Sequence, residues 1–224
     1  MYASIPSATI RGVEGQPVWV EVHSGRGLPG LTLVGLPDAA CREARDRVRA
    51  AVLAAGATWP DTRVTVNLAP SATRKVGSGL DLAIAIGILV ASEGLTADQV
   101  AGRGFVGELG LDGTVRPVPG VLSRVAALSC EEVVVPVASA VEAALVEGPL
   151  VRAVATLGEV LAALAGDEPW PEHPPPRPVA PPPQPPDLRD VRGQAVVRTA
   201  LEVAAAGGHH LLMVGPPGAG KTML

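Results

Sequence analysis

The residues whose types and spacing could do chemistry are concentrated at positions 215–222. The segment GPPGAGKT matches the pattern GxxxxGK[ST] at every fixed position. Glycines let backbone N–H groups approach phosphate oxygens without Cβ clashes, and the N-terminus of a following helix adds its dipole. The lysine would neutralise the β- and γ-phosphates of ATP, and the threonine hydroxyl would ligate Mg²⁺. The predicted nucleotide-binding residues are Gly215, Pro216, Pro217, Gly218, Ala219, Gly220, Lys221 and Thr222, with Thr222 also the metal ligand.

The surrounding sequence supports a phosphate-binding loop. The chain has only two lysines, Lys75 and Lys221, so a chance match to the pattern is rare. The segment before the loop predicts a helix over about 194–206 and then a short buried strand over 209–214, which is the context the loop needs. ATP hydrolysis also needs an acidic strand end and usually an arginine from a neighbour. We therefore predict no catalytic residue within the chain, and we expect an amino-terminal fragment of an ATPase that is inactive by itself.

A proline-rich segment separates the loop from the rest of the chain. Residues 168–187 hold 11 of the 23 prolines. Such a segment cannot form a helix or a central strand, and as polyproline II it extends by about 3.1 Å per residue as a semi-rigid spacer. Docking of an SH3-like partner on its PxxP spacing is the alternative. We predict a first domain at 1–166, a linker at 167–187 and the start of a P-loop domain at 188–224.

Strand-like and helix-like patterns alternate in the first domain. Asp38 is suited to capping the first long helix and Gly56 to ending it. The alternation predicts an α/β domain with a mixed sheet. Strands are predicted from Pro17, Leu31 and Arg63, as a pair within 104–118, at Val133 and at 151–156, and helices at 38–55, 79–92, 120–129, 138–146 and 158–165.

Composition narrows the class of protein. Hydrophobic residues make up 47% of the 224 residues but aromatic residues only 2%, so a core must be built from Ala, Val, Leu and Ile. The net charge is −4, and no basic tail or strongly basic domain indicates binding to nucleic acid. Cys41 and Cys130 fit neither a CxxC motif nor a disulfide framework. No signal peptide is recognisable, and the longest apolar run, 82–92, is too short for a bilayer, so we expect a cytoplasmic protein.

Long stretches of the chain resemble the YifB/ComM family, the magnesium chelatase-like AAA+ proteins of bacteria. These stretches are VEVHSGRGLPGLTLVGLPDAACREARDRVRAAV from Val20, VNLAPSATRKVGSGLDLAIAIGILVAS from Val66 and GFVGELGLDGTVRPVPGVL from Gly104. The segment from Asp190 to Leu224 is similar to the start of the family's ATPase domain. The resemblance implies a first domain with the fold of Lon-type peptidases and ribosomal protein S5 domain 2, joined to a truncated AAA+ P-loop domain.

The same resemblance implies a function for the full-length protein. Members that resemble ComM are ATP-driven homo-hexameric motors that remodel or branch-migrate DNA, branched or single-stranded, during competence and recombination. ATP and Mg²⁺ are the implied cofactors, and no membrane is involved. Packing of the segment Asp187–Gln194 against adenine is likewise implied by the resemblance alone.

A Lon-like fold raises the question of peptidase activity. In RKVGSGLD the serine position of Lon-type peptidases falls on Gly79, with Ser78 one place early, and the lysine position falls on Leu122. A Ser–Lys dyad needs an amine of lowered pKa, and no lysine occurs within 76–220. Arg124 cannot replace it because a guanidinium stays protonated. We therefore predict no peptidase activity and expect the fold to serve as a scaffold or interaction surface.

Two further groups of residues have competing interpretations. Arg42, Arg45 and Arg49 share one face of the first long helix and could meet DNA phosphates, but interleaved acidic residues favour a solvated face with local ion pairs. His209 and His210 suggest a metal site, but side chains of adjacent strand residues point apart and no Cys or carboxylate cluster completes a ligand set.

Two alternative functions remain open from the sequence. A chelatase-type ATPase motor for metal insertion would be stimulated by a porphyrin-binding partner subunit and would be indifferent to DNA. A non-catalytic binding module would follow if the chain naturally ended at Leu224. An open reading frame continuing into an apolar strand that ends in Asp-Glu would exclude the binding module.

Overall fold

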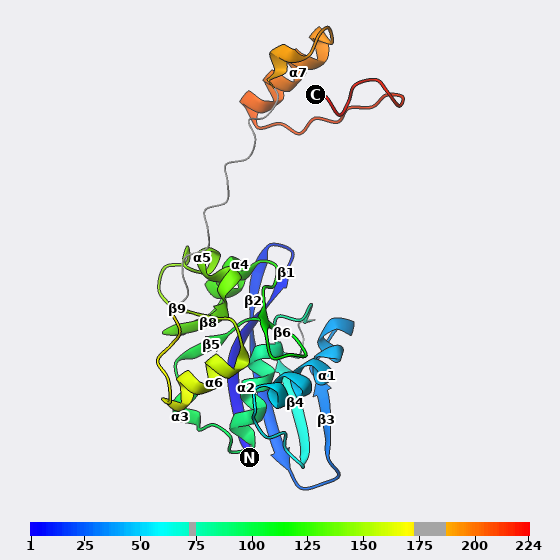
Figure 1. Cartoon of the computed structure of the whole chain (residues 1–224). Coiled ribbons are helices and arrows are strands. Elements are labelled where there is room, and N and C mark those ends of the chain that lie inside the picture. The colour runs from blue at the N-terminus through cyan, green and yellow to red at the C-terminus, as the bar shows by residue number, and fades with distance from the viewer. Residues whose placement is uncertain (72–74, 173–186) are drawn as a thin grey trace. The chain divides into compact units, whose positions relative to one another are not determined.

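The computed structural model describes residues 1–71, 75–172 and 187–224 (Figure 1). The chain divides into two compact units, Met1–Pro176 and Arg177–Leu224. Most of the predicted linker, residues 173–186, lies outside the described residues. Among the described helices, none has the length and apolar character needed to cross a membrane.

The first unit contains a four-stranded mixed sheet with the strand order β1-β2-β4-β3. Its strands are β1 (Tyr2–Arg11), β2 (Glu14–Gly25), β3 (Gly30–Val34) and β4 (Arg63–Ala69). β2 is antiparallel to β1 and β4, whereas β3 is parallel to β4, which confirms the predicted α/β class with a mixed sheet. β1 was not predicted, because buried hydroxyls obscure its alternation. Ser7 and Thr9 are buried there and donate to the carbonyls of Phe105 and Val76.

A second, three-stranded sheet is wholly parallel and has the order β5-β8-β9. Its strands are β5 (Arg103–Phe105), β8 (Glu132–Pro136) and β9 (Leu150–Val154). A short antiparallel ribbon is formed by β6 (Glu108–Leu109) and β7 (Val115–Arg116). The strand pair predicted within 104–118 is present as β6 and β7, and β5 is an additional strand in this range that pairs with β8.

The first long helix, α1 (Ala39–Ala54), begins and ends as its sequence predicts. The Asp38 carboxylate accepts a hydrogen bond from the Cys41 amide at 2.8 Å, which satisfies one of the free N–H groups of the first turn. Gly56 follows the helix with a φ of 77°, a conformation that costs glycine little.

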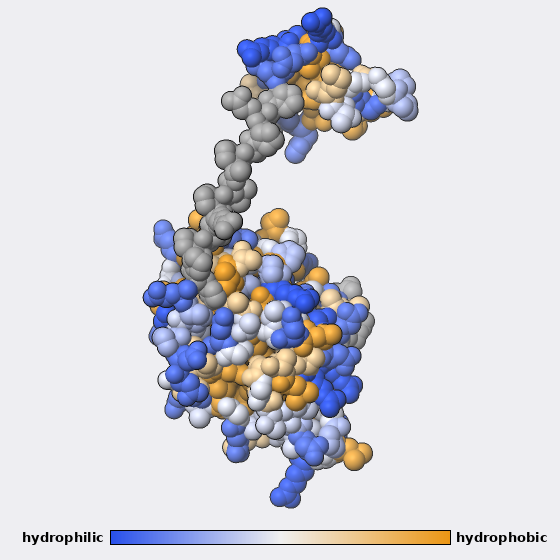
Figure 2. All heavy atoms as spheres, in the orientation of Figure 1, coloured by the Kyte–Doolittle hydropathy of each residue, from blue (hydrophilic) through white to orange (hydrophobic). Residues whose placement is uncertain are grey.

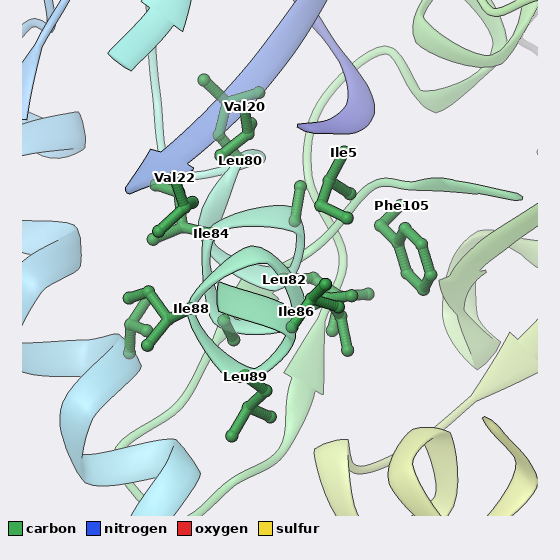
Figure 3. Packing of buried hydrophobic residues seen from close by; sticks show 14 of the residues in the cluster. Ile5, Val20, Val22, Leu80, Leu82, Ile84, Ile86, Ile88, Leu89 and Phe105 are labelled. Atoms are coloured by element: carbon green, nitrogen blue, oxygen red, sulfur yellow. The ribbon is translucent and has the colours of Figure 1, made fainter. Parts of the chain in front are cut away.

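The core of the first unit is built around α2 (Asp81–Ala91), whose residues are all buried. Figure 3 shows Ile84, Ile86 and Ile88 of this helix among side chains from β1, β2 and β5. Gly87 provides the close approach: a Cβ at this position would lie 2.7 Å from Val22 Cγ2. Small aliphatic side chains therefore allow the helix to lie directly on the mixed sheet.

The remaining helices of the first unit are short. They are α3 (Ala97–Val100), α4 (Val121–Ala126), the 3₁₀ turn η1 (Val137–Ser139), α5 (Ala140–Ala143) and α6 (Leu157–Ala165). The helix predicted over 120–129 ends at Ala126, and the helix predicted over 138–146 is reduced to η1 and α5. α6 starts one residue earlier than predicted, because Thr156 and Glu159 form a capping box at its N-terminus.

The second unit contains the 3₁₀ turn η2 (Leu188–Asp190) and the helix α7 (Ala195–Gly207). α7 agrees with the predicted helix over 194–206. The buried strand predicted over 209–214 is wrong, because these residues pair with no strand and most of them are exposed. Strands form by pairing, and the described residues of this unit supply no second strand.

Candidate functional site

The predicted phosphate loop, residues 215–222, has the backbone path that its glycines permit. Gly218 and Gly220 adopt φ values of 81° and 79°, which residues with a Cβ rarely adopt. Nothing lies within 4 Å of a Cβ built on Gly218, so conformation rather than crowding requires a glycine there. The Gln194 side chain donates from Nε2 to the Ala219 carbonyl at 3.1 Å and ties the loop to the start of α7.

The Lys221 ammonium is held by the loop itself. Nζ donates to the carbonyls of Gly215 and Pro216, both at 2.8 Å. The loop therefore curls around the one cationic group that the motif supplies. An ammonium has three donors, so a further acceptor can be bound, and a charged phosphate oxygen is a stronger acceptor than a carbonyl. The structure brings together Gly215, Pro216 and Lys221 of the predicted set.

Ala219 is also held within the loop, since its amide donates to the Pro216 carbonyl at 3.3 Å. Thr222 is exposed, and the Met223 amide donates to the Gly220 carbonyl at 3.0 Å. This hydrogen bond forms a turn and not the helix that was expected after the loop. Thr222 is adjacent to Lys221 in sequence, and its role as a metal ligand stays a prediction. The loop residues thus fit a nucleotide phosphate.

Apolar surface surrounds the loop. A cavity of about 320 Å³ is lined by residues of α7, by the extended segment 211–215 and by Lys221. Gln194, from the segment that the resemblance places near adenine, also lines it. Figure 2 shows hydrophobic residues gathered on one side of this unit, next to hydrophilic residues of α7. The exposed large hydrophobic residues of the unit include Val196, Val203, Leu212, Val214 and Met223.

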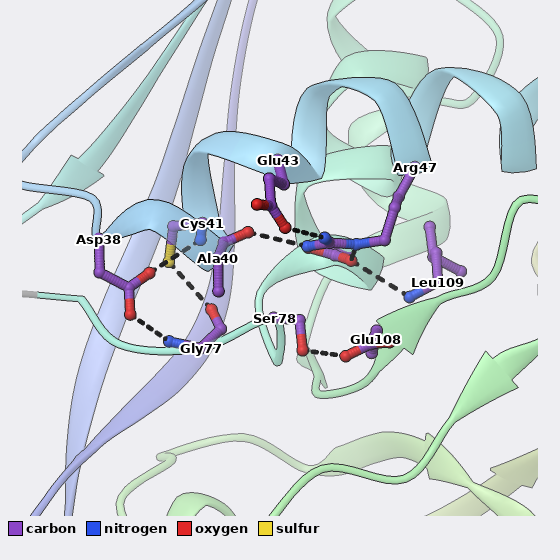
Figure 4. A network of polar contacts seen from close by, with 10 residues as sticks. Asp38, Ala40, Cys41, Glu43, Arg47, Gly77, Ser78, Glu108 and Leu109 are labelled. Atoms are coloured by element: carbon purple, nitrogen blue, oxygen red, sulfur yellow. Dashed lines mark hydrogen bonds and ion pairs between the residues drawn. The ribbon is translucent and has the colours of Figure 1, made fainter.

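A second polar cluster lies in the first unit around the segment 77–79, which precedes α2 (Figure 4). The Ser78 hydroxyl donates to the Glu108 carboxylate at the start of β6. Leu122, at the expected lysine position, is partly exposed on α4, and Arg124 is buried on the same helix. The only hydrogen-bond partner of the Ser78 hydroxyl among the described residues is therefore a carboxylate, and no amine meets it.

A buried ion pair joins α1 to the start of α2. Arg47 donates from Nε and Nη2 to the two carboxylate oxygens of Asp81, at 2.7 and 3.1 Å, and also from Nη2 to the Ala40 carbonyl at 2.9 Å. The Asp81 side chain is 1% exposed. It accepts a further hydrogen bond from the Leu109 amide at 3.3 Å. This pair fixes α1, α2 and β6 relative to one another, and the sequence analysis did not identify it.

Burial raises the pKa of Asp81 from 3.8 to about 6, even though the hydrogen bonds and charge of Arg47 act in the opposite direction. Removing the carboxylate from water disfavours its charged form. The same ion pair raises the pKa of Arg47, chiefly through the hydrogen bond to Asp81. For the Asp81 carboxylate, desolvation thus outweighs the attraction of the Arg47 charge. The Arg47 guanidinium itself stays charged at any pH near neutrality.

The pKa of Asp81 predicts a pH dependence of stability. Between pH 4 and 6 the folded state binds more protons than the unfolded state, so the contribution of Asp81 to the free energy of unfolding is largest below about pH 4 and is lost as the pH rises through about 6. Relative to Asp81→Asn, the wild type should lose on the order of 3 kcal/mol across this window. Urea denaturation of both proteins measures the difference, and parallel pH curves would contradict it.

The other predicted candidates are spread over the molecule. Arg45 and Arg49 are exposed on α1, and the side chain of Arg42 lies outside the described residues. His209 and His210 are exposed next to the C-terminal end of α7. In the described ranges, no group of three or more His, Cys, Asp or Glu residues is arranged to hold a metal ion.

The two cysteines are free. The Cys41 thiol is buried and donates to the Gly77 carbonyl at 3.0 Å. Burial, with the nearby charge of Asp38, raises the pKa of Cys41 to about 12. The thiolate is the nucleophilic form of cysteine, so Cys41 is inert at neutral pH and acts as a small core residue.

Two family models match the chain. The model described as subunit ChlI of Mg-chelatase matches residues 20–139, which cover most of the first unit. The model described as magnesium chelatase, subunit ChlI, matches residues 187–224, which carry α7 and the phosphate loop. The two matches therefore include both candidate sites.

Curated relatives match nearly the whole chain. YifB of Escherichia coli is 44% identical over 95% of this chain and 42% of its own length. The competence protein ComM of Haemophilus influenzae is 42% identical over 99% of this chain and 45% of its own length. An uncharacterized protein of Mycobacterium tuberculosis is 46% identical over 97% of this chain and 44% of its own length. The chain spans less than half the length of these relatives. It belongs to the YifB/ComM family of magnesium chelatase-like proteins.

Proposed function

We propose that the chain is the amino-terminal part of a ComM-like AAA+ ATPase and that residues 215–222 bind ATP with Mg²⁺. The observation that carries the proposal is the loop itself. It matches the motif at every fixed position, two of its glycines have positive φ, and its lysine is held by the first two carbonyls of the loop. Lys221 would bind the β- and γ-phosphates, and Thr222 would ligate the Mg²⁺ that supplies charge neutralisation there.

The loop residues have distinct tasks in this proposal. The backbone N–H groups of Gly218 and Gly220 would cradle the phosphates, since Pro216 and Pro217 have no N–H and the Ala219 amide donates to the Pro216 carbonyl at 3.3 Å. Gln194 holds the loop against the start of α7 through the Ala219 carbonyl, which limits the freedom that a nucleotide must remove on binding.

The first unit is proposed to have a Lon/S5-type fold used as a scaffold and not as a peptidase. Its mixed sheet with α2 lying on it supports an α/β scaffold. The chemistry argues against peptidase activity: Ser78 is hydrogen-bonded to Glu108, and no lysine occurs within 76–220. The base of a Ser–Lys dyad is a neutral amine, and a carboxylate is the partner that Ser78 has instead.

DNA remodelling is proposed for the full-length protein. Support comes from the relative described as a competence protein, which covers 99% of this chain. By this proposal the full-length protein is a cytoplasmic homo-hexamer that uses ATP to remodel or branch-migrate branched or single-stranded DNA during transformation and recombination.

The test is ATP hydrolysis by the protein purified from its native cells, after its intact mass has been recorded. We expect turnover that increases at least severalfold with branched or single-stranded DNA. A control reaction contains a porphyrin-binding chelatase subunit in place of DNA. Turnover that ignores DNA but responds to that subunit would contradict DNA remodelling and support a chelatase-type motor.

A further inference from the structure

A cavity of about 750 Å³ opens in the first unit, away from the phosphate loop in sequence. It is bordered by the turn after β1, by the segment before α2 and by the start of α4. Ile10, Val76 and Val118 give it apolar walls, and Arg124 contributes a guanidinium. Its volume lies within the range of small-molecule sites, and such sites combine mainly apolar walls with a few polar groups.

Arg124 is an unusual residue to find in such a wall. It is 4% exposed, and its hydrogen bonds are made only to carbonyls, from Nε to Pro119 at 3.2 Å and from Nη1 to Ala8. In the described residues no carboxylate pairs with it, although a guanidinium offers five N–H donors. Burying a cation without a counter-charge is costly. Burial lowers the pKa of Arg124, but the guanidinium remains charged.

The backbone is shaped to hold the guanidinium in place. A Cβ at Gly79 would lie 2.7 Å from Arg124 Nη1 and 2.9 Å from Cζ, so a glycine is required for this close approach. The segment is fixed from elsewhere, since Asp38 accepts the Gly77 amide at 3.0 Å and Glu108 accepts the Ser78 hydroxyl. Those two carboxylates are thus engaged by other donors. The guanidinium is positioned before any ligand arrives.

We propose that this cavity binds a carboxylate carried on an aliphatic group and that Arg124 is the residue that fixes the carboxylate. The planar guanidinium matches the two oxygens of a carboxylate, and the spare donors on Nη1 and Nη2 allow the pair to be bidentate. Ile10, Val76 and Val118 provide an apolar surface for the aliphatic group. Arg11, which is exposed, also lines the cavity, so inorganic phosphate is the competing anion to compare with the carboxylate.

The ligand chemistry has two sources, a free aliphatic acid and the C-terminus of a peptide that ends in an aliphatic residue. The probes are N-acetyl-leucine, a tetrapeptide ending in leucine, and N-acetyl-leucinamide, which lacks the carboxylate. Binding to the 224-residue chain is followed by NMR through the amides of 77–79 and the Arg124 Nε–H. We expect both acids to shift these signals and the amide to leave them unchanged. The tighter of the two acids identifies the source.

Two variants locate the site. Arg124→Met keeps the length of the side chain but removes the charge, and it should weaken binding of the acids by about 10- to 100-fold. Val76→Trp adds bulk at a cavity residue that is 46% exposed, so it should block binding without disturbing the fold. It therefore gives an answer even if Arg124→Met fails to fold. Arg49→Met, an exposed arginine outside the cavity, is the matched control and should bind like the wild type.

Several results would overturn the proposal. One is that neither acid shifts the signals at millimolar concentration, and another is that the amide binds as well as the acids. Inorganic phosphate or a DNA oligonucleotide that shifts the same signals as strongly would show that the cavity selects another anion. None of these outcomes depends on ATP. The proposal for the cavity can therefore fail while the proposal for the phosphate loop holds, and the reverse is also true.

Discussion

ATP turnover by the full-length protein is expected to fall by at least about 10²- to 10³-fold when Lys221 is replaced by alanine. Lys221 is the only lysine within residues 76–224, and the loop holds its ammonium through the carbonyls of Gly215 and Pro216. In the proposed site its removal would leave the phosphate charge without the lysine that neutralises it. Steady-state phosphate release at saturating ATP measures the effect.

A matched pair of variants at the next residue controls for damage to the loop. Thr222→Ser keeps the hydroxyl that would ligate Mg²⁺ and should retain most of the turnover, whereas Thr222→Val keeps the shape and should lose it. The first unit should remain folded in all three variants. Because Trp19, Trp59 and Trp170 all lie in that unit, its unfolding can be followed by their fluorescence. Turnover that persists in Lys221→Ala would refute the phosphate site.

Arg47→Met is expected to lower the free energy of unfolding of the first unit by about 3–5 kcal/mol. The variant leaves Asp81, which is 1% exposed, with neither the charge nor the two hydrogen bonds that now balance its burial. The pKa of Asp81 should rise further, because Arg47 now lowers it. Urea denaturation at pH 7, followed by tryptophan fluorescence, measures the change.

A double-mutant cycle separates the ion pair from general damage to α1. Combining Arg47→Met with Asp81→Asn removes both charges, and the double variant should be more stable than the two single effects add up to, by about 0.5–3 kcal/mol. Glu43→Gln is the control. Glu43 lies 3.6 Å from Arg47 Nη1 but is 74% exposed, so its loss should cost at most about 1 kcal/mol. Strict additivity in the cycle would contradict a coupled pair.

Local signals explain which parts of the fold the sequence predicted. α1 was found because Asp38 and Gly56 mark its two ends, and β2 and β4 because valines alternate with polar residues along them. β1 was missed because Ser7 and Thr9 occupy buried positions, where only their contacts with Phe105 and Val76 make a polar side chain acceptable. Those contacts lie far away in sequence.

The predicted strand over 209–214 failed for a different reason. Its apolar sequence describes a strand that would be buried in a sheet, but pairing depends on other strands, and the described part of the second unit has none. The segment therefore has no regular secondary structure and is mostly exposed. The hydrophobic pattern correctly identified the segment as apolar, but the secondary structure predicted from it was wrong.

The candidate sites also differ in how far local sequence could predict them. The phosphate loop is contiguous, so its motif could be recognised from spacing alone. Arg47 and Asp81 are 34 residues apart, and Arg124 reaches Ala8 across 116 positions, so only the folded chain brings them together. Arg124 entered the sequence analysis solely as a residue that cannot replace a lysine. Its burial beside an apolar cavity gave it a separate role.

Hydrogen–deuterium exchange with and without ATP and Mg²⁺ tests the nucleotide site most directly, because it reports where the nucleotide binds and does not require turnover. The full-length protein is compared with its Lys221→Ala variant. We predict that ATP with Mg²⁺ slows exchange in peptides covering 213–224 of the wild type and has no such effect in the variant. Unchanged exchange over these residues while ATP protects another region would contradict the assignment of the phosphate loop.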